Sequence, residues 1–330
     1  MELPIIFEND TLDDKKDSYL LALEKAYDNY MNEIENDIKN DKVKSEIKKI
    51  CDTIKKSYKQ WCCGDCQQAL NTLKYVLKKR MGCDKLKIGF KDLFSKSNSN
   101  SEVLYKARIA DPNSLELKED DMLHIPLNRR YLVQNQRFSI AGCPCIYMCN
   151  NSYTCWTELG KPEFSRFYVS AIKITQQNKM QLLNLYDDGT TFSGDRLYVF
   201  PLIIAISFKN YDNKRKFKPE YVISSMIMIL LSHLGCDGVI YSSNCAPHYT
   251  TVLNMNIAIP VKGKETDKCF FVGSPHNFRD FELLGEFERI SGTKRQMGPI
   301  DFQYVQICKK MTQYHCLDFS LFDNYISGRM

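Results

Sequence analysis

The first third of the chain contains a long stretch with no helix-breaking residue. Neither glycine nor proline occurs over Ile5–Cys63, so only polar residues can interrupt a helix in this stretch. Over Asp13–Met81, apolar side chains recur every three or four positions with acidic residues and lysines between them, which is the period of an amphipathic helix. We therefore predict a helical hairpin with a polar hinge at Asn40 and Asp41.

The bulk composition describes a globular chain. Its 330 residues are 44% hydrophobic and 12% aromatic, which is enough apolar material for one large core or two modest ones. The formal net charge of +5 suits an anionic ligand but is too small to require nucleic acid. The longest apolar run, Leu197–Phe208, is interrupted by Pro201 and is shorter than the ~20 residues of a membrane helix. We expect a cytoplasmic protein with no membrane or nucleic-acid partner.

The 14 cysteines are interpreted as reduced thiols, because they are a small share of a long chain and no N-terminal stretch has the pattern of a secretion signal. Cys62, Cys63 and Cys66 include a Cys-x-x-Cys spacing, which is found in zinc sites. No second pair of similar spacing lies nearby, and the first 100 residues contain no histidine. We therefore predict buried thiols between helices here, with a bound metal as the alternative.

The character of the sequence changes at a polar stretch, Ser95–Glu102, whose composition is typical of a flexible connector. We predict a helical module over residues 1–95, a linker over 96–102, a catalytic domain over 103–260 and an extension over 261–330 that packs on the catalytic domain. The clearest helix is Pro219–Leu234, which starts at a proline and stops at a glycine. β-branched and aromatic residues predict strands over Val103–Ala107, Cys145–Cys149, Tyr168–Ile174, Gly238–Tyr241 and Thr251–Ile259.

The middle of the chain carries the most informative pattern. The run Arg137–Ser139 is followed by a Gly-Cys-Pro turn and then by the predicted strand that contains Tyr147. A short helix that carries Glu158 follows this strand. Either Asn151 or Ser152 can cap that helix with its side-chain oxygen.

Two further motifs flank this pattern. Tyr105–Arg108 reads YKAR, and Asp237–Cys245 reads DGVIYSSNC, a strand that ends in tyrosine followed by two serines. In this order, over Val103–Pro260, the motifs resemble the RES family, which consists of bacterial toxins that destroy NAD. Each motif alone is weak, so the resemblance depends on the ordered set.

The resemblance assigns residues one by one. The arginine, glutamate and serine from which the family takes its name correspond to Arg137, Glu158 and Ser243. An earlier arginine of the family corresponds to Arg108, although Lys106 can fill the same role.

The resemblance implies an α+β fold similar to that of ADP-ribosyltransferases, with a mixed bent sheet and flanking helices. It implies NAD as substrate, cleaved at the bond between nicotinamide and ribose, with no metal and no other cofactor. Such cleavage passes through an oxocarbenium-like transition state that a carboxylate stabilises, and a forked guanidinium binds pyrophosphate better than lysine does. The implied catalytic residues are Glu158, Arg137 and Ser243, and the implied NAD-binding residues are Arg108, Tyr147, Lys106 and Ser139.

Several alternatives stay open. Water, phosphate or a macromolecule can accept the ADP-ribosyl group, so the resemblance implies an NAD glycohydrolase or phosphorylase, which we favour, with an ADP-ribosyltransferase acting on protein or nucleic acid as the alternative. The lysine at position 106 also leaves room for a non-catalytic NAD-binding regulator. Without the family pattern Glu158 would be an ordinary solvated carboxylate, and Ser242 is a one-residue alternative to Ser243.

The resemblance also implies biological partners. A toxin that depletes NAD, in a toxin-antitoxin or antiphage system, is restrained by an antitoxin or a regulatory protein, and a homo-oligomer stays open. The N-terminal helices are the candidates for this regulation. The hypothesis predicts altered activity or complex formation when residues 1–95 are removed.

Overall fold

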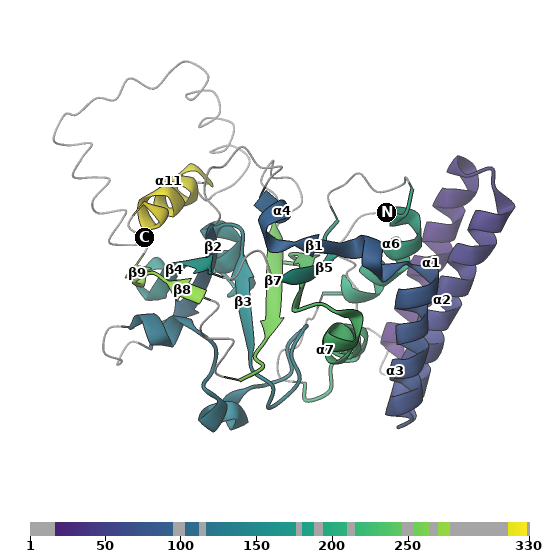
Figure 1. Ribbon diagram of the computed structural model, residues 1–330, viewed down its shortest axis with the longest axis horizontal. Helices are drawn as coiled ribbons and strands as arrows, with labels where there is room; N and C mark the ends of the chain where they lie inside the picture. The colour runs from purple at the N-terminus through teal and green to yellow at the C-terminus, as the bar shows by residue number, and fades with distance from the viewer. Residues whose placement is uncertain are drawn as a thin grey trace, which may run out of the picture.

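One mixed sheet organises the fold (Figure 1). The computed structural model describes residues 17–94, 103–111, 117–175, 180–187, 194–209, 215–245, 254–263, 270–277 and 316–328. Within these ranges the sheet has nine strands in the order β1-β5-β6-β7-β3-β2-β4-β8, and β9 pairs with β4. The strands are β1 (Lys87–Gly89), β2 (Val103–Ile109), β3 (Cys145–Cys149), β4 (Phe167–Ile174), β5 (Gln181–Leu185), β6 (Gly238–Ser242), β7 (Met255–Pro260), β8 (Phe270–Val272) and β9 (His276–Asn277). The α+β class expected from the sequence is confirmed.

The sheet consists of two parts. Strands β5 and β6 are parallel, whereas the neighbouring pairs β6-β7, β7-β3 and β2-β4 are antiparallel. Strands β2 and β3 meet at one register pair, Tyr105 with Cys149, although β2 pairs with β4 along its whole length. The part β1-β5-β6-β7-β3 is therefore joined to the part β2-β4-β8-β9 at a single point.

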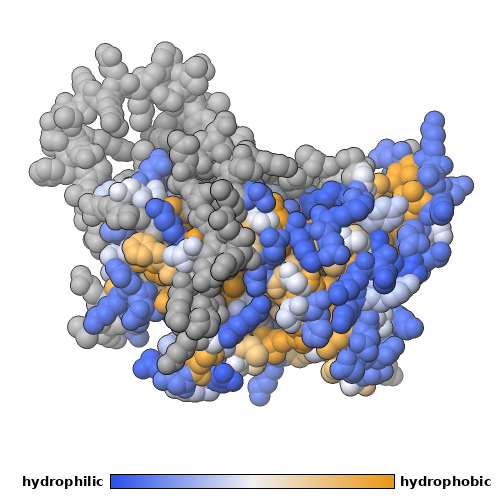
Figure 2. Space-filling model, in the orientation of Figure 1, coloured by the Kyte–Doolittle hydropathy of each residue, from blue (hydrophilic) through white to orange (hydrophobic). Residues whose placement is uncertain are grey.

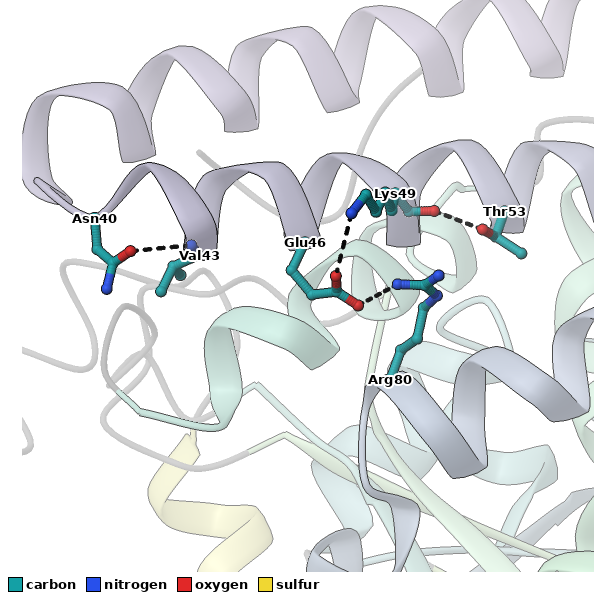
Figure 3. Close-up of polar contacts among 6 residues, drawn as sticks. All are labelled: Asn40, Val43, Glu46, Lys49, Thr53 and Arg80. Carbon is teal, nitrogen blue, oxygen red and sulfur yellow. Dashed lines mark hydrogen bonds and ion pairs between the residues drawn. The ribbon is translucent and has the colours of Figure 1, made fainter.

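The N-terminal hairpin forms as predicted. Helix α1 (Ser18–Asp37) is followed by helix α2 (Asp41–Cys62), and Asn40 caps α2. Its side-chain oxygen accepts hydrogen bonds from the backbone N–H groups of Lys42 at 3.0 Å and Val43 at 3.4 Å, the second of which is drawn in Figure 3. Such a cap satisfies N–H groups that the first helical turn leaves unpaired. The polar hinge expected at this position is confirmed.

Helix α3 (Cys66–Tyr75) continues the N-terminal layer alongside α2. Its extension, the single π-turn η1 (Val76–Arg80), carries Arg80, which forms an ion pair with Glu46 of α2 (Figure 3). The visible side of these helices is mainly hydrophilic in Figure 2. Their apolar side, including Ile47, Ile50 and Leu73, is fully buried. The amphipathic pattern therefore directs one side of the layer into the core.

The N-terminal helices also complete the hydrogen bonding of helix α6 (Arg196–Ile206), which contains Pro201. Because proline has no N–H, the carbonyl four residues earlier, at Leu197, has no helical donor. The Tyr30 hydroxyl donates to that carbonyl at 2.9 Å. Tyr27 and Tyr19 donate to the carbonyls of Pro201 at 3.0 Å and Ala205 at 2.8 Å. Helix α6 is thus paired with α1 by polar contacts as well as by packing.

Helices cover one face of both parts of the sheet. Helices α6, α7 and the N-terminal layer share one apolar core with β5, β6 and β7. Helices α5 and α11 share a smaller core with β2 and β4. The short helix α4 joins a third apolar cluster with the side chains of the opposite face. The remaining helices are α3 (Cys66–Tyr75), α4 (Phe90–Phe94), α5 (Ser152–Glu158), α7 (Val222–Leu234) and α11 (Cys316–Ser327), with short turns η2 (Cys83–Leu86), η3 (Glu119–Met122), η4 (Leu127–Leu132), η5 (Phe164–Arg166) and η7 (Pro219–Tyr221).

The helices and strands predicted within residues 103–260 are largely confirmed. All five predicted strands overlap β2, β3, β4, β6 and β7. The predicted helix at 219–234 forms as η7 followed by α7, and Gly235 ends it with a φ of 70°, a left-handed conformation that suits glycine. Strands β1, β5, β8 and β9 were not predicted. Of these, β1 comes from residues within the predicted helical module and pairs with β5.

Some expectations fall partly outside the described residues. The predicted linker over 96–102 lies outside them, as does much of the predicted extension over 261–330. The domain boundaries therefore stay predictions. The interpretation of Cys62, Cys63 and Cys66 as buried thiols is wrong, because all three are exposed and free at the turn between α2 and α3. Among the described helices, none has both the length and the apolar character needed to cross a bilayer.

Candidate functional site

Helix α5 carries Glu158 at its last position. Asn151, one of the two predicted caps, starts the helix, since its side-chain oxygen accepts from the backbone N–H of Thr154 at 2.7 Å. Gly160, with a φ of 79°, lets the chain turn away directly after the helix. Glu158 is therefore fixed at the end of a short helix whose residues 152–157 are all buried, while Glu158 itself is exposed.

Two buried donors hold the Glu158 carboxylate. The Ser243 hydroxyl donates to Glu158 Oε1 at 2.6 Å, and the Asn256 amide donates to the same oxygen at 2.7 Å. Ser243 is 1% exposed and Asn256 is 3% exposed. Hydrogen bonds to a carboxylate are among the stronger ones. The structure therefore brings the predicted residues Glu158 and Ser243 into direct contact, and it leaves Oε2 outside both hydrogen bonds.

Asn256 is a site residue that the sequence interpretation missed. It lies on β7, between Tyr241 of β6 and Cys149 of β3. The Cys149 thiol donates to the Asn256 side-chain oxygen at 3.1 Å, which leaves the amide nitrogen to face Glu158. Asparagine inside an apolar strand run was the available signal, since a buried amide needs partners. A hydrogen bond with Cys155, then burial, and also the negative charge of Glu158 raise the pKa of the Cys149 thiol.

Arg137 lies in a tight turn closed by reciprocal backbone hydrogen bonds between Gln136 and Ser139. Its guanidinium donates to the carbonyl of Ile206 and, at 2.9 Å, to the carbonyl of Phe208. Ile206 is the last residue of α6, and Phe208 lies two residues beyond it. The helix dipole favours a cation at this C-terminal end. The predicted catalytic role of Arg137 toward NAD stays a prediction. In this structure its guanidinium links the turn to the end of α6 by hydrogen bonds.

Tyr147 supports the same turn from β3. Its hydroxyl donates to the Ser139 hydroxyl at 3.1 Å and accepts from the backbone N–H of Phe138 at 3.2 Å. Burial raises the pKa of the Tyr147 phenol well above its ordinary value. Tyr147 and Ser139 are therefore adjacent, as expected for one site. Their contacts hold the turn, and their predicted contact with NAD stays a prediction.

Lys106 and Arg108 occupy the strand β2 where it leaves β3. The Lys106 ammonium donates to the backbone carbonyl of Tyr147 at 3.4 Å. Burial, and then the positive charge of Arg108, lower the pKa of Lys106 to about 8. Arg108 donates to the carbonyl of Leu123 at 3.1 Å, and its buried Nε has no hydrogen-bond partner among the described residues. Both side chains are cations withdrawn from water without a carboxylate in an ion pair within the described part of the chain.

The predicted residues thus form linked groups. Glu158 and Ser243 belong to the first, with Asn256. Tyr147, Ser139 and Lys106 form the second group. Cys149 lies between the two groups, since the charges of both Glu158 and Lys106 affect the pKa of its thiol. Arg137 lies against α6, whose following carbonyl at Phe208 also accepts from Asn244 at 3.3 Å, and Asn244 is the neighbour of Ser243. Arg108 instead contacts the loop at Leu123.

The site can serve ionic and hydrogen-bonding chemistry. It combines one exposed carboxylate, a serine hydroxyl, an amide and partly buried cations. Within the described residues, no group of three or more histidine, cysteine, aspartate or glutamate side chains is placed to hold a metal ion. These side chains fit an anionic substrate with an electron-poor carbon at the carboxylate.

Comparisons with known proteins give one related sequence. No family profile matches the chain. A protein of Bacillus subtilis (strain 168), named "Putative toxin YopC", is 28% identical over 198 residues. The match covers 52% of this chain and 45% of that protein, so the chain spans less than half of the relative's length.

One solved structure was also found. It is titled "Crystal structure of the M.tuberculosis MbcT-MbcA toxin-antitoxin complex", and the match covers 53% of this chain and 82% of that chain. The sequence identity is 10% and the TM-score is 0.31. A TM-score of this size does not establish a shared fold.

Proposed function

We propose that this chain is an enzymatic toxin that consumes NAD by cleaving the bond between nicotinamide and ribose. The observation that carries the proposal is the exposed Glu158 carboxylate, held at one oxygen by Ser243 at 2.6 Å and Asn256 at 2.7 Å. An oriented carboxylate stabilises the positive charge that develops on the ribose when nicotinamide leaves. The order of the motifs and the name of the Bacillus subtilis relative support the toxin assignment.

The cations of β2 support NAD as the substrate. Lys106 and Arg108 are partly buried, and Arg108 Nε has no hydrogen-bond partner among the described residues. A buried, unpaired donor is unfavourable unless a ligand satisfies it. The pyrophosphate of NAD carries the oxygens and the negative charge that these two side chains lack. Arg137 would join them only after giving up a carbonyl contact.

The proposal is tested by following free nicotinamide when the purified protein is incubated with NAD, in buffers with and without phosphate. We expect release by the wild type and a loss of at least about a hundredfold for Glu158→Gln, since removing one electrostatic group of this kind typically slows the reaction ~100- to 1,000-fold. Glu163→Gln is the matched control, because Glu163 is an exposed carboxylate just beyond α5.

The outcomes separate the open alternatives. Release that requires phosphate identifies phosphorolysis, and release in both buffers identifies hydrolysis. Radiolabel from NAD on a macromolecule would identify an ADP-ribosyltransferase. Equal nicotinamide release by the wild type and Glu158→Gln would refute the role of Glu158. Binding of NAD without turnover would instead indicate a non-catalytic regulator. An antitoxin or other restraining partner stays a prediction.

The pH dependence of NAD binding tests the role of Lys106. Its pKa of about 8 means that the ammonium loses its charge as the pH rises through this value. We therefore expect the KM for NAD to rise up to about tenfold per pH unit above pH 8, since one charge is lost. Lys106→Arg keeps the charge, because arginine stays protonated. Its KM should stay flat, and an identical rise in both proteins would contradict the assignment.

A further inference from the structure

A buried carboxylate on the C-terminal helix is not used by the proposed chemistry. Asp323 lies on α11 and is 8% exposed. Both of its carboxylate oxygens lie 3.2 Å from the backbone N–H of Ser152, which is the first residue of α5. Within the described residues, no lysine, arginine or histidine forms an ion pair with Asp323. Its carboxylate is therefore hydrogen-bonded to the start of the helix that ends at Glu158.

Aromatic packing fixes α11 along the rest of α5. The Phe319 ring lies 5.4 Å from that of Tyr153 and 5.5 Å from that of Trp156. Phe322 and Ile326 of α11 are 0% and 2% exposed. Buried aromatic side chains supply large apolar contact areas. Helix α11 is thus attached to α5 by one apolar side and by one hydrogen-bonded carboxylate.

We propose that α11 is a latch on α5, and that Asp323 is a positioning residue which, through Ser152, sets Glu158 against Asn256 and Ser243. This inference rests on the role proposed for Glu158. Helix α5 has seven residues, so it rises only about 10 Å at 1.5 Å per residue. A helix this short moves as a rigid body, and a shift at Ser152 is transmitted to Glu158.

The chemistry of Asp323 makes the latch sensitive to pH. Burial raises the pKa of Asp323 from 3.8 to about 7, against hydrogen bonding from Ser152, which lowers it. The docked side chain is therefore neutral below about pH 7, whereas an undocked side chain ionises above about pH 4. Between these values undocking releases a proton, so docking weakens as the pH rises and levels off above pH 7.

Among the described residues, the other ionisable groups near Asp323 form no ion pair with it. Tyr105 of β2 donates its hydroxyl to the Asp323 backbone carbonyl at 3.3 Å, and burial raises the pKa of that phenol. Cys155 of α5 lies in the same core. His276 of β9 packs its ring 5.7 Å from that of Tyr325. The pH dependence is therefore assigned to the Asp323 carboxyl.

Hydrogen exchange in the full chain tests the latch without relying on activity. After correction for the intrinsic rate, we expect exchange of the α5 amides to speed up by as much as about tenfold per pH unit between pH 5 and pH 7 in the wild type. Asp323→Asn keeps an oxygen that accepts from Ser152 but cannot ionise, so its exchange should not vary with pH. Asn324→Ala, at an exposed position of α11, should follow the wild type. The same pH dependence in wild type and Asp323→Asn would overturn the proposal.

Activity then tests the link to Glu158. We expect Asp323→Ala to lower the kcat of nicotinamide release about tenfold or more, with the KM for NAD within about twofold, and Asp323→Asn to restore kcat and flatten its pH profile below pH 7. Unchanged kcat in Asp323→Ala would overturn the positioning role. If Asp323→Ala does not fold, the pH profile of kcat in Asp323→Asn tests the positioning role, and a profile like that of the wild type would overturn it. A wild type that does not consume NAD refutes the proposed function, while the exchange experiment still decides the latch.

Discussion

The N-terminal helices and α11 lie at opposite ends of the molecule (Figure 1), and each covers a different part of the same sheet. The N-terminal helices share one continuous apolar core with α6 and α7, and their tyrosines complete the hydrogen bonding of α6. Helix α11 is attached by a smaller aromatic cluster and by Asp323, a buried carboxylate. The first attachment is mainly apolar, with tyrosine hydroxyls bonded to backbone carbonyls of α6, whereas the second includes a carboxyl group whose charge depends on pH.

This difference changes the view of the N-terminal region. The sequence suggested a separate regulatory module, because the helical period ends near a polar stretch. The shared core and the three tyrosine contacts with α6 make these helices part of the structure that supports Arg137. Regulation through the N-terminal helices stays a prediction, and α11 is the element that contacts the helix carrying Glu158.

The largest expected effect comes from deleting each region in turn. Removing residues 1–62 exposes the apolar sides of α6 and α7, so we expect an insoluble protein or one without cooperative unfolding. Removing residues 316–330 should leave a cooperative thermal transition at a lower temperature. Circular dichroism during heating measures both. A soluble, cooperative protein without residues 1–62 would break the comparison.

A substitution on β7, at the residue paired with Cys149 of β3, should affect activity more than stability. Asn256→Ala removes one of the two donors to Glu158, which we expect to lower kcat about ten- to a hundredfold, since a hydrogen bond to a charged group contributes about 1.5–3 kcal/mol. Asn71→Ala, at an exposed position of α3, is the control. Full activity in Asn256→Ala would mean that Ser243 alone orients the carboxylate.

A smaller effect should follow from losing one polar contact of the N-terminal layer. Tyr30→Phe leaves the Leu197 carbonyl without a donor, because Pro201 cannot supply one. We expect the free energy of unfolding to fall by about 1–3 kcal/mol, the range for a buried unsatisfied group. Urea denaturation measures this, with Tyr75→Phe as the control, since Tyr75 is 52% exposed. No difference between the two variants would show that another group satisfies the carbonyl.

The smallest effect is expected at the ion pair between Arg80 and Glu46 (Figure 3). The two side chains are 23% and 33% exposed, so solvent screens their attraction. Glu46→Gln should lower the free energy of unfolding by about 0.2–1 kcal/mol. The loss should shrink in high salt. A larger loss, insensitive to salt, would indicate that this contact is part of the core rather than of its edge.

Local pattern explains which parts of the fold could be predicted. The hairpin hinge at Asn40, the cap at Asn151 and the stop at Gly235 follow from short-range chemistry, and all three are confirmed. Strand β5 is short and parallel to β6, so it has no alternating pattern and no adjacent turn to reveal it. Strand β1, at three residues, is too short for any periodic signal.

The candidate site shows the same limit. The motif order placed Glu158 and Ser243 in one site, and the structure joins them by a hydrogen bond. Asn256 carries no motif, and its role depends on the sheet register that places it between Cys149 and Tyr241. The exposed thiols at Cys62 and Cys66 were wrongly predicted as buried, because burial at a helix turn depends on what packs there.

Periodicity and caps within short stretches were enough to predict the helical hairpin, and the ordered motifs pointed to the α+β class and to Glu158 and Ser243 as candidate residues. Three features depend instead on the packing of distant segments: α1 completes the hydrogen bonding of α6, Asn256 donates to Glu158, and Asp323 accepts from the start of α5. Each of these contacts joins residues about a hundred or more positions apart. Such pairs are selected by packing and by the need to satisfy buried polar groups, which no local pattern records.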